Sequence, residues 1–242
     1  MPPPLRVLFV SDTHLGFDLP VRRRSFVERR RRGPDFFACF ERALEPALRG
    51  DADVVVHGGD VLYRSRVPAS LVQRALEPLA RVAARGVPVL LVPGNHERSV
   101  IPYPLLAERE RLHVFHRPST VIVECHGMRV AFAGFPYARD VRRSFTALLD
   151  ATRYRASPVD ARVLCVHHCV EGATCGPPPG YTFRDGDDVI AARDLPGDVA
   201  VVLSGHVHRH QSCSSFACAN PSPGTLHYTP IGSAWSRARR RT

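Results

Sequence analysis

The 242-residue sequence contains no lysine, so all 33 of its basic residues are arginine. It has no apolar run of about 18 residues, which argues against a membrane-spanning helix. The N-terminus lacks the charged start, the apolar stretch and the small-residue cleavage site of a secretory signal. We therefore expect a cytoplasmic protein.

The cysteines form an odd, irregularly spaced set that contains no Cys-x-x-Cys pair. Such a set is not typical of a disulfide framework or of a zinc knuckle. We therefore expect seven reduced thiols that are mostly buried. They are Cys39, Cys125, Cys165, Cys169, Cys175, Cys213 and Cys218.

The formal net charge of the chain is +10. A strong positive balance favours an anionic partner, with nucleic acid as the first candidate, and the planar guanidinium group suits phosphate. Two arginine runs, Arg22–Arg24 and Arg29–Arg32, follow the first polar motif of the chain. They either contact a phosphate backbone or form a solvated charged loop, because runs of like charge usually remain in solvent.

Short apolar runs separated by helical patterns predict a βαβαβ arrangement in the first half of the chain. The expected strands cover residues 5–10, 53–56 and 87–92, and the expected helices cover residues 35–49 and 69–85. This alternation predicts parallel strands with helical crossovers. In such sheets ligands bind beyond the carboxyl ends of the strands.

The second half of the chain begins with shorter strands. Residues 112–116, 120–125 and 129–134 are expected in hairpin order, with a tight turn at His126-Gly127. A helix over residues 140–154 and two buried strands, 162–166 and 199–203, are expected to follow. Beyond Gln211 the composition changes. We expect a catalytic domain over residues 1–211 and a divergent or poorly ordered, arginine-rich tail over residues 212–242.

Polar side chains follow the ends of five expected strands. Asp-x-His and His-x-His spacings place alternate side chains on one side of an extended segment, so that two ligands can converge on one ion. Mixed imidazole and carboxylate donors suit Mn, Fe, Zn or Ni. The residues concerned are Asp12, His14, Asp60, Asn95, His96, His167, His206 and His208.

Each of these clusters has an ordinary explanation when it is taken alone. An aspartate after a strand is usually a turn or cap residue, and a single histidine is usually a surface or core residue. All five clusters nevertheless occur at strand ends, in one compatible order. Their joint occurrence favours one dinuclear metal site over five separate turns.

These clusters resemble the five sequence blocks of the calcineurin-like metallophosphoesterase superfamily. The matching motifs are Asp12-x-His14, Gly59-Asp60, Gly94-Asn95-His96-Glu97, His167 and Gly205-His206-x-His208. The resemblance runs from about residue 5 to 211. It implies a four-layer α/β/β/α sandwich, in which two facing sheets are flanked by helices and the dinuclear site lies at the strand ends.

The resemblance also implies a role for each of these residues. Asp12, His14 and His208 would hold one divalent ion, and Asp60 would bridge to a second. Asn95, His167 and His206 would complete the second site. His96 would be the catalytic imidazole, and His14 would orient it. His168 follows the same strand as His167 and competes with it for the ligand role, although the family pattern favours His167.

A narrower resemblance connects the chain to the SbcD-type exonucleases of DNA repair. It rests on four segments: Ser11–Gly16, Val56–Asp60, Val166–Gly172 and Gly205–Gln211. It implies a manganese-dependent nuclease that acts on DNA ends together with an SMC-like ATPase.

Two alternatives stay open at this point. One is a phosphoesterase for nucleotides, cyclic nucleotides or phosphoproteins, and the other is an inactive metal-binding protein. The segment Ala234–Arg237 departs from the SbcD-type pattern, which leaves DNA selection and the ATPase partnership open.

Overall fold

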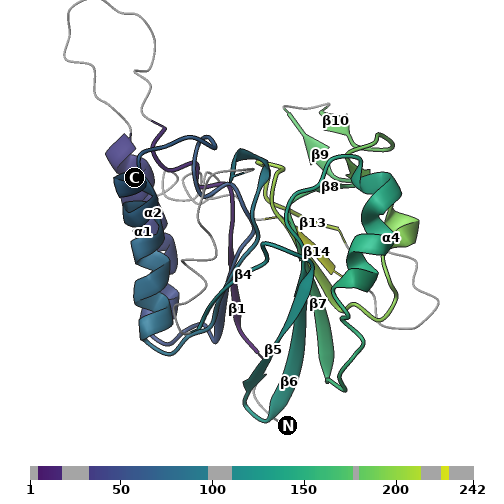
Figure 1. Ribbon diagram of the computed structural model, residues 1–242, viewed down its shortest axis with the longest axis horizontal. Helices are drawn as coiled ribbons and strands as arrows, with labels where there is room; N and C mark the ends of the chain where they lie inside the picture. Colours follow the sequence, from purple (N-terminus) through teal and green to yellow (C-terminus); the bar gives the residue numbers. More distant parts are fainter. Residues whose placement is uncertain (1–4, 18–32, 98–110, 177–179, 214–224, 229–242) are drawn as a thin grey trace, which may run out of the picture.

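Two β-sheets face each other and carry helices on their outer sides, as the ribbon in Figure 1 shows. The computed structural model describes residues 5–17, 33–97, 111–176, 180–213 and 225–228. The predicted four-layer α/β/β/α sandwich is confirmed. Within the described residues, every helix is too short or too polar to cross a membrane.

The first sheet contains four parallel strands in the order β1-β2-β3-β4. Their bounds are Val7–Val10 for β1, Val54–His57 for β2, Val89–Leu91 for β3 and Leu112–Val114 for β4. Helices α1 (Gly33–Leu48) and α2 (Ala69–Ala84) connect the first three strands and cover the outer face of the sheet (Figure 1). The first three strands and both helices were predicted within a few residues of these bounds.

The expected hairpin position of residues 112–116 is wrong. Strand β4 pairs in parallel with β3 at the edge of the first sheet, with Leu90 opposite His113. The reason is burial, since Leu112 and Val114 pack into the core beneath α1 and α2. Only β5 (Ser119–Cys125) and β6 (Met128–Gly134) form the expected hairpin.

The second sheet has the strand order β13-β14-β12-β7-β6-β5. The remaining bounds are Ala161–Val166 for β7, Val201–Ser204 for β12, Gln211–Cys213 for β13 and Thr225–Tyr228 for β14. Helix α4 (Val141–Ala151) covers its outer face (Figure 1). Two short strand pairs lie beyond the strand ends of this sheet: β8 (Cys169–Val170) with β11 (Val189–Ile190), and β9 (Thr174–Cys175) with β10 (Tyr181–Thr182).

Alternating side chains of the buried strands fill two different cores. In β2, Val55 packs under the helices, whereas Val54 and Val56 face the second sheet. In β7, Val163 and Cys165 face the first sheet, whereas Leu164 packs beneath α4. Because strands buried on both faces need apolar residues at every position, these strands read as continuous apolar runs in the sequence.

Strands β13 and β14 extend the second sheet past residue 211, since β14 pairs in parallel with β12 and antiparallel with β13. The other residues of the expected tail, 214–224 and 229–242, lie outside the described residues. The arginine runs at 22–24 and 29–32 also lie outside them. The division of the chain at residue 211 therefore stays a prediction.

The five cysteines whose side chains are described are free thiols. The expectation that the cysteines are mostly buried is wrong for these five. Cys165 and Cys169 are buried, but Cys39, Cys125 and Cys175 are partly exposed.

The two sheets depend on a shared apolar core, which can be tested at Phe132. This side chain is fully buried between the sheets. We expect Phe132→Ala to lower the free energy of unfolding by about 3–5 kcal/mol, because it leaves a cavity in a packed core. Urea titration measures the loss. Glu124→Ala on the neighbouring strand serves as a control, since its side chain is 72% exposed, and should change stability by at most about 0.5 kcal/mol. Equal effects of the two substitutions would contradict the assignment of this core.

Candidate metal centre

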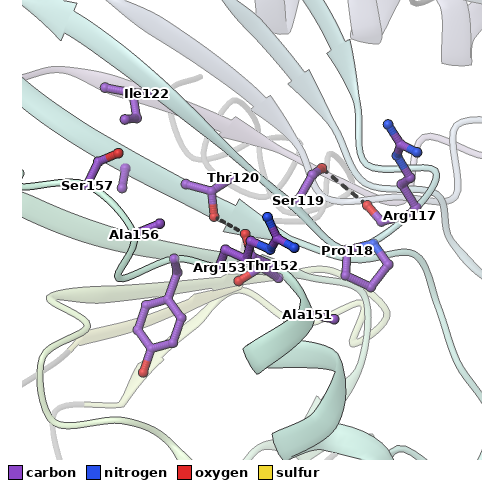
Figure 2. Close-up of a pocket in the computed structure, with 12 residues that line it drawn as sticks. Arg117, Pro118, Ser119, Thr120, Ile122, Ala151, Thr152, Arg153, Ala156 and Ser157 are labelled. Carbon is purple, nitrogen blue, oxygen red and sulfur yellow. Dashed lines mark hydrogen bonds between the residues drawn. The ribbon is translucent and has the colours of Figure 1, made fainter.

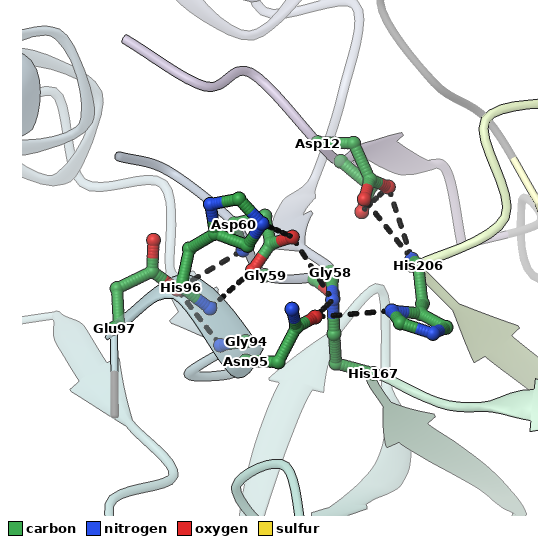
Figure 3. A network of polar contacts seen from close by, with 12 residues as sticks. Asp12, Gly58, Gly59, Asp60, Gly94, Asn95, His96, Glu97, His167 and His206 are labelled. Atoms are coloured by element: carbon green, nitrogen blue, oxygen red, sulfur yellow. Dashed lines mark hydrogen bonds and ion pairs between the residues drawn. The ribbon is translucent and has the colours of Figure 1, made fainter. Parts of the chain in front are cut away.

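The structure brings all eight polar residues expected at strand ends to one edge of the sandwich. They come from the carboxyl ends of β1, β2, β3, β7 and β12, and Figure 3 shows Asp12, Asp60, Asn95, His167 and His206 directed toward a common centre. Parallel strands in each sheet place their carboxyl ends at the same edge, and the two sheets place these edges side by side. The groups that converge there are imidazoles, carboxylates and one amide.

Asp60 lies at the middle of this cluster. Its Oδ1 accepts a hydrogen bond of 3.0 Å from the backbone N–H of His96. Its Oδ2 faces three imidazole nitrogens, the Nε2 atoms of His167 at 3.4 Å, His96 at 3.8 Å and His14 at 3.9 Å. One carboxylate therefore reaches donor groups on three different strand ends.

His167 has its tautomer fixed by the backbone. Its Nδ1–H donates to the carbonyl oxygen of Gly58 at 2.6 Å. Its Nε2 consequently faces inward, at 3.1 Å from Oδ1 of Asn95. The same amide oxygen lies 3.0 Å from Nδ1 of His206. Asp60, Asn95, His167 and His206 thus surround one part of the centre.

Asp12, His14 and His208 surround the other part. The Nε2 atoms of His14 and His208 lie 3.1 Å apart, and Nε2 of His208 lies 3.3 Å from Oδ1 of Asp12. The carboxylate of Asp12 is oriented by the backbone N–H of His206, which donates to both of its oxygens at 3.1 Å. The Ser11 hydroxyl also donates to Oδ2 of Asp12, at 2.6 Å.

His96 approaches the cluster from the short 3₁₀ helix η1 (Asn95–Glu97). Its Nδ1–H donates to the carbonyl oxygen of Tyr63 at 2.6 Å. That bond leaves Nε2 as the atom on the side of Asp60 and His14, and the rings of His14 and His96 meet edge to face at 4.8 Å. His96 can therefore exchange a proton at Nε2 with a group bound in the centre.

His168 points away from the cluster, unlike its neighbour His167. Its Nε2 contacts the backbone of Ala138 at 3.1 Å, and its ring stacks on Tyr137 at 5.0 Å. Its Nδ1 is buried and has no partner among the described residues. Burial lowers the pKa of His168 to about 3. The side chain is a neutral packing group in the second sheet.

The electrostatics of the inner residues reflect close opposite charges. Burial lowers the pKa of His167, but the hydrogen bond and charge of Asp60 outweigh it and raise that pKa to about 9. Burial raises the pKa of Asp12, yet its hydrogen bond with His208 and the charge of His167 hold that pKa below the ordinary range. Both carboxylates in the centre, Asp12 and Asp60, are ionised at neutral pH, since the pKa of Asp60 is lowered as well.

The donor set fits divalent cations. Nε2 of His167 faces two oxygen acceptors, and two imidazole Nε2 atoms face each other across 3.1 Å. Such opposed acceptors repel unless a proton or a cation lies between them. Three overlapping groups have donor atoms within 4.8 Å of one another, namely Asp12/His14/His208, Asp12/Asp60/His167 and His14/Asp60/His96. Imidazole together with oxygen donors suits Mn, Fe, Zn or Ni.

The backbone at the strand ends bends sharply to direct these side chains inward. Asp12, His14, Asp60 and His206 all have positive φ, with values of 57°, 44°, 52° and 83°. Residues other than glycine rarely adopt this conformation, and it concentrates at functional sites. Gly59 has a φ of 106°, and a Cβ there would collide with Nδ1 of His167. A side chain at this position would displace a ligand candidate.

Glu97 is a residue of the centre to which the sequence patterns assigned no role. Its side chain is 3% exposed, and it accepts backbone hydrogen bonds from Asp60 at 3.0 Å, Leu62 at 2.8 Å and Gly94 at 2.8 Å. Burial and the charge of Asp60 raise its pKa to about 7. Glu97 therefore joins the loops after β2 and β3. The acid directly after Asn95-His96 was the available signal for it.

His57 is a second inner residue without an expected role. The backbone N–H of Gly59 donates to its Nδ1 at 3.2 Å, so its proton is on Nε2, which lies 3.3 Å from the Thr13 hydroxyl. That hydroxyl donates onward to the carbonyl oxygen of Val61 at 3.0 Å. Burial lowers the pKa of His57 to about 3. This neutral chain fixes the loop after β1 against the loop after β2.

A separate hollow lies on the second sheet beside the end of α4, and its lining is shown in Figure 2. Its side chains include Arg117, Arg153, Ser119 and Tyr154 but no carboxylate, imidazole or thiol. The hollow therefore lacks the side chains that usually bind metals, unlike the cluster at the edge of the sandwich.

The sequence is similar to a known protein family and to characterised proteins. The sequence model of the calcineurin-like phosphoesterase family matches residues 5–210. The chain is 26% identical over 210 residues to the DNA double-strand break repair protein Mre11 of Saccharolobus solfataricus. The aligned region covers 84% of this chain and 49% of that protein. It is 35% identical over 203 residues to Mre11 of Haloferax volcanii, covering 84% and 41%. The chain thus spans about half the length of these relatives, or less.

Solved structures share the fold at low sequence identity. A dimetal phosphatase from Danio rerio superposes with a TM-score of 0.57 at 12% identity, over 94% of this chain and 88% of that one. A putative 5′-nucleotidase from Staphylococcus aureus superposes with a TM-score of 0.53 at 17% identity, over 93% of this chain and 48% of that one. At these identities the likeness concerns the fold alone.

The link formed by Glu97 can be tested by amide substitution. Glu97→Gln replaces one acceptor oxygen by an NH₂ group, so at least one buried backbone N–H loses its partner. We expect the free energy of unfolding to fall by about 1–3 kcal/mol. Denaturant titration measures it. Glu171→Gln is the matched control, because Glu171 accepts a single bond from Ala192 that an amide oxygen can keep. A smaller loss at Glu97 than at Glu171 would contradict the proposed link.

Proposed function

Because the chain belongs to the calcineurin-like phosphoesterase family, we propose that it is a metal-dependent hydrolase of phosphodiester bonds in DNA. The family implies divalent metal ions and phosphoester substrates. The observation that carries the proposal is the convergence of Asp60 with imidazoles from three other strand ends, at 3.4–3.9 Å. The proposal also includes two more specific statements, namely that the substrate is DNA and that the activity is that of an exonuclease.

The proposed ligands fall into two sets that share Asp60. Asp12, His14 and His208 would hold one ion, and Asn95, His167 and His206 would hold the other. The inward direction of Nε2 in His167 supports this residue over His168, whose ring contacts Ala138 instead. Manganese is the proposed metal, because the SbcD-type resemblance implies it, and these donors also accept Fe, Zn or Ni.

The side chains of this chain would divide the chemistry among them. When bound, paired divalent ions lower the pKa of a water molecule and neutralise charge on the phosphoryl oxygens. His96 would hold a proton at Nε2 and pass it to the leaving alkoxide, because its Nδ1–H is already committed to the carbonyl of Tyr63. His14 would orient that imidazole through the edge-to-face contact of their rings.

DNA is the proposed substrate for two reasons. The relatives named Mre11 are DNA double-strand break repair proteins, and one of them is 35% identical to this chain. The net charge of +10 also favours a polyanion. From the SbcD-type resemblance we also propose an SMC-like ATPase partner. We propose a cytoplasmic location as well.

One set of assays tests the substrate. The purified protein is incubated with Mn²⁺ and, separately, linear duplex DNA, single-stranded DNA, bis-p-nitrophenyl phosphate and p-nitrophenyl phosphate. We expect degradation of DNA from its ends and hydrolysis of the diester. Activity on p-nitrophenyl phosphate alone would replace the proposal with a phosphomonoesterase for small substrates or phosphoproteins. Metal binding without hydrolysis of any of these substrates would instead indicate an inactive metal-binding protein.

His96 provides a test of the chemical step. We expect His96→Ala to lower kcat on the diester by about 10²–10⁴-fold, the usual contribution of general acid–base catalysis. The metal content, measured by mass spectrometry on the same sample, should stay at the wild-type level. Loss of an ion from this variant would instead make His96 a ligand, and near-normal turnover would remove its catalytic role.

The neighbouring histidines His167 and His168 offer a matched pair for the metal site. We expect His167→Ala to lose about one ion per chain, because the second proposed site loses an inward-facing nitrogen. His168→Gln should keep the full metal content, since this ring lies outside the centre. Metal analysis after dialysis against buffered Mn²⁺ distinguishes the two. The reverse result would exchange the roles of the two histidines.

A further inference from the structure

An exposed aromatic side chain lies beside the candidate centre. Phe17 is 41% exposed. Among the described residues, only Phe17 and Tyr181 are large apolar side chains that are exposed. Leaving such a ring in water costs free energy that burial would recover. Phe17 has neither a charge nor a hydrogen-bonding group, so its exposed surface is suited to contact with another apolar or aromatic group.

The position of Phe17 is determined by the same backbone that holds the ligand candidates. Its N–H donates to the carbonyl oxygen of His14 at 3.2 Å. The segments after β1 and β2 run side by side at this point, through a parallel bridge between Leu15 and Leu62 and a 3.2 Å hydrogen bond from the Tyr63 N–H to the Leu15 carbonyl. Phe17 is thus one tight turn away from His14.

Two other aromatic rings support Phe17 from within the protein. Phe36 meets it edge to face at 6.2 Å, and Tyr63 does so at 6.4 Å. The guanidinium group of Arg64 lies over the Tyr63 ring at 4.8 Å from its centroid. These contacts hold Phe17 in place while part of its surface faces solvent. The result is an aromatic platform formed by Phe17 and Tyr63 with a cationic neighbour, Arg64.

The platform is physically linked to the proposed proton donor. The carbonyl oxygen of Tyr63 accepts the 2.6 Å hydrogen bond from Nδ1 of His96. The residue that supplies one ring of the platform therefore also positions the imidazole of His96. Arg64 and Arg66 are exposed in the same loop, where they can contact an adjacent phosphate.

We propose that Phe17 is the stacking surface for the nucleobase next to the scissile phosphate. The chemistry on this rim matches a nucleotide unit, since a flat apolar ring faces the base and cations face the phosphates. A phosphoserine or phosphothreonine peptide would present no planar ring of this kind beside its phosphate. This inference rests on the proposed function and gives it a substrate class, namely unpaired nucleic-acid strands whose bases are free to stack.

The experiment compares Phe17→Ala with the wild type on two single-stranded substrates of equal length. One is an ordinary oligodeoxynucleotide, and the other has the same backbone with every base replaced by an abasic tetrahydrofuran unit. We expect the wild-type kcat/KM to be about five- to one-hundred-fold higher on the oligonucleotide with bases, the range of base–aromatic stacking. Phe17→Ala should reduce this preference toward one, while activity on the abasic strand stays the same.

Two further variants separate stacking from a merely apolar or structural role. Phe17→Trp should keep the preference for bases, and Phe17→Leu should lose it, because leucine retains apolar bulk without a flat ring. Arg117→Ala, which alters the separate hollow shown in Figure 2, is the surface control and should behave as the wild type. Metal content and thermal unfolding are measured on each variant.

The outcomes distinguish this inference from the function on which it rests. A wild-type protein that hydrolyses bis-p-nitrophenyl phosphate but neither oligonucleotide would overturn both. Cleavage of the oligonucleotide with an unchanged base preference in Phe17→Ala would overturn the stacking role alone. An equal loss on both strands, with normal metal content, would also overturn it, because Phe17 would then act on the centre itself rather than on the base.

Discussion

The carboxylate of Asp60 is the group on which the rest of this site depends. One of its oxygens is fixed by the backbone of His96, and the other faces imidazoles from β1, β3 and β7. Its own backbone N–H is held by the buried carboxylate of Glu97. A negative charge in such a place requires positive charge nearby, because the interior solvates ions poorly. Protonated imidazoles or bound cations supply it.

The strand ends that carry these groups are strained, and the strands behind them hold that strain. Four inner residues adopt positive φ, which is unfavourable for side-chain-bearing residues. They are attached to strands buried on both sides, between a shared core and two helical layers. Neutral contacts then fix the loops, as in the chain from His57 through Thr13 to Val61. A rigid scaffold thus carries an otherwise unfavourable arrangement of charges.

The centre and its rim have different consequences for function. The carboxylates, the amide and the imidazoles of the centre suit phosphoester chemistry, but they do not select the group to which the phosphate is attached. Selection among phosphoesters depends on the groups around the centre. Phe17, Tyr63 and Arg64 form one such part of the rim, and they are connected to the centre through the backbone contacts of His14 and His96.

The sequence by itself determined the ligand candidates and the order of strands and helices in the first half of the chain, because both follow local rules. The four-layer sandwich was expected from the family resemblance. Buried parallel strands appear as continuous apolar runs, and ligand candidates such as Asp12 and His208 stand a few residues after them. Tertiary structure decided the features that depend on partners distant in the chain. It placed β4 in the first sheet, because the helices above bury Leu112 and Val114. It separated His167 from His168, since the two rings meet Asn95 and Ala138 respectively. The role of Glu97 and the aromatic support of Phe17 likewise exist only once the loops are folded together.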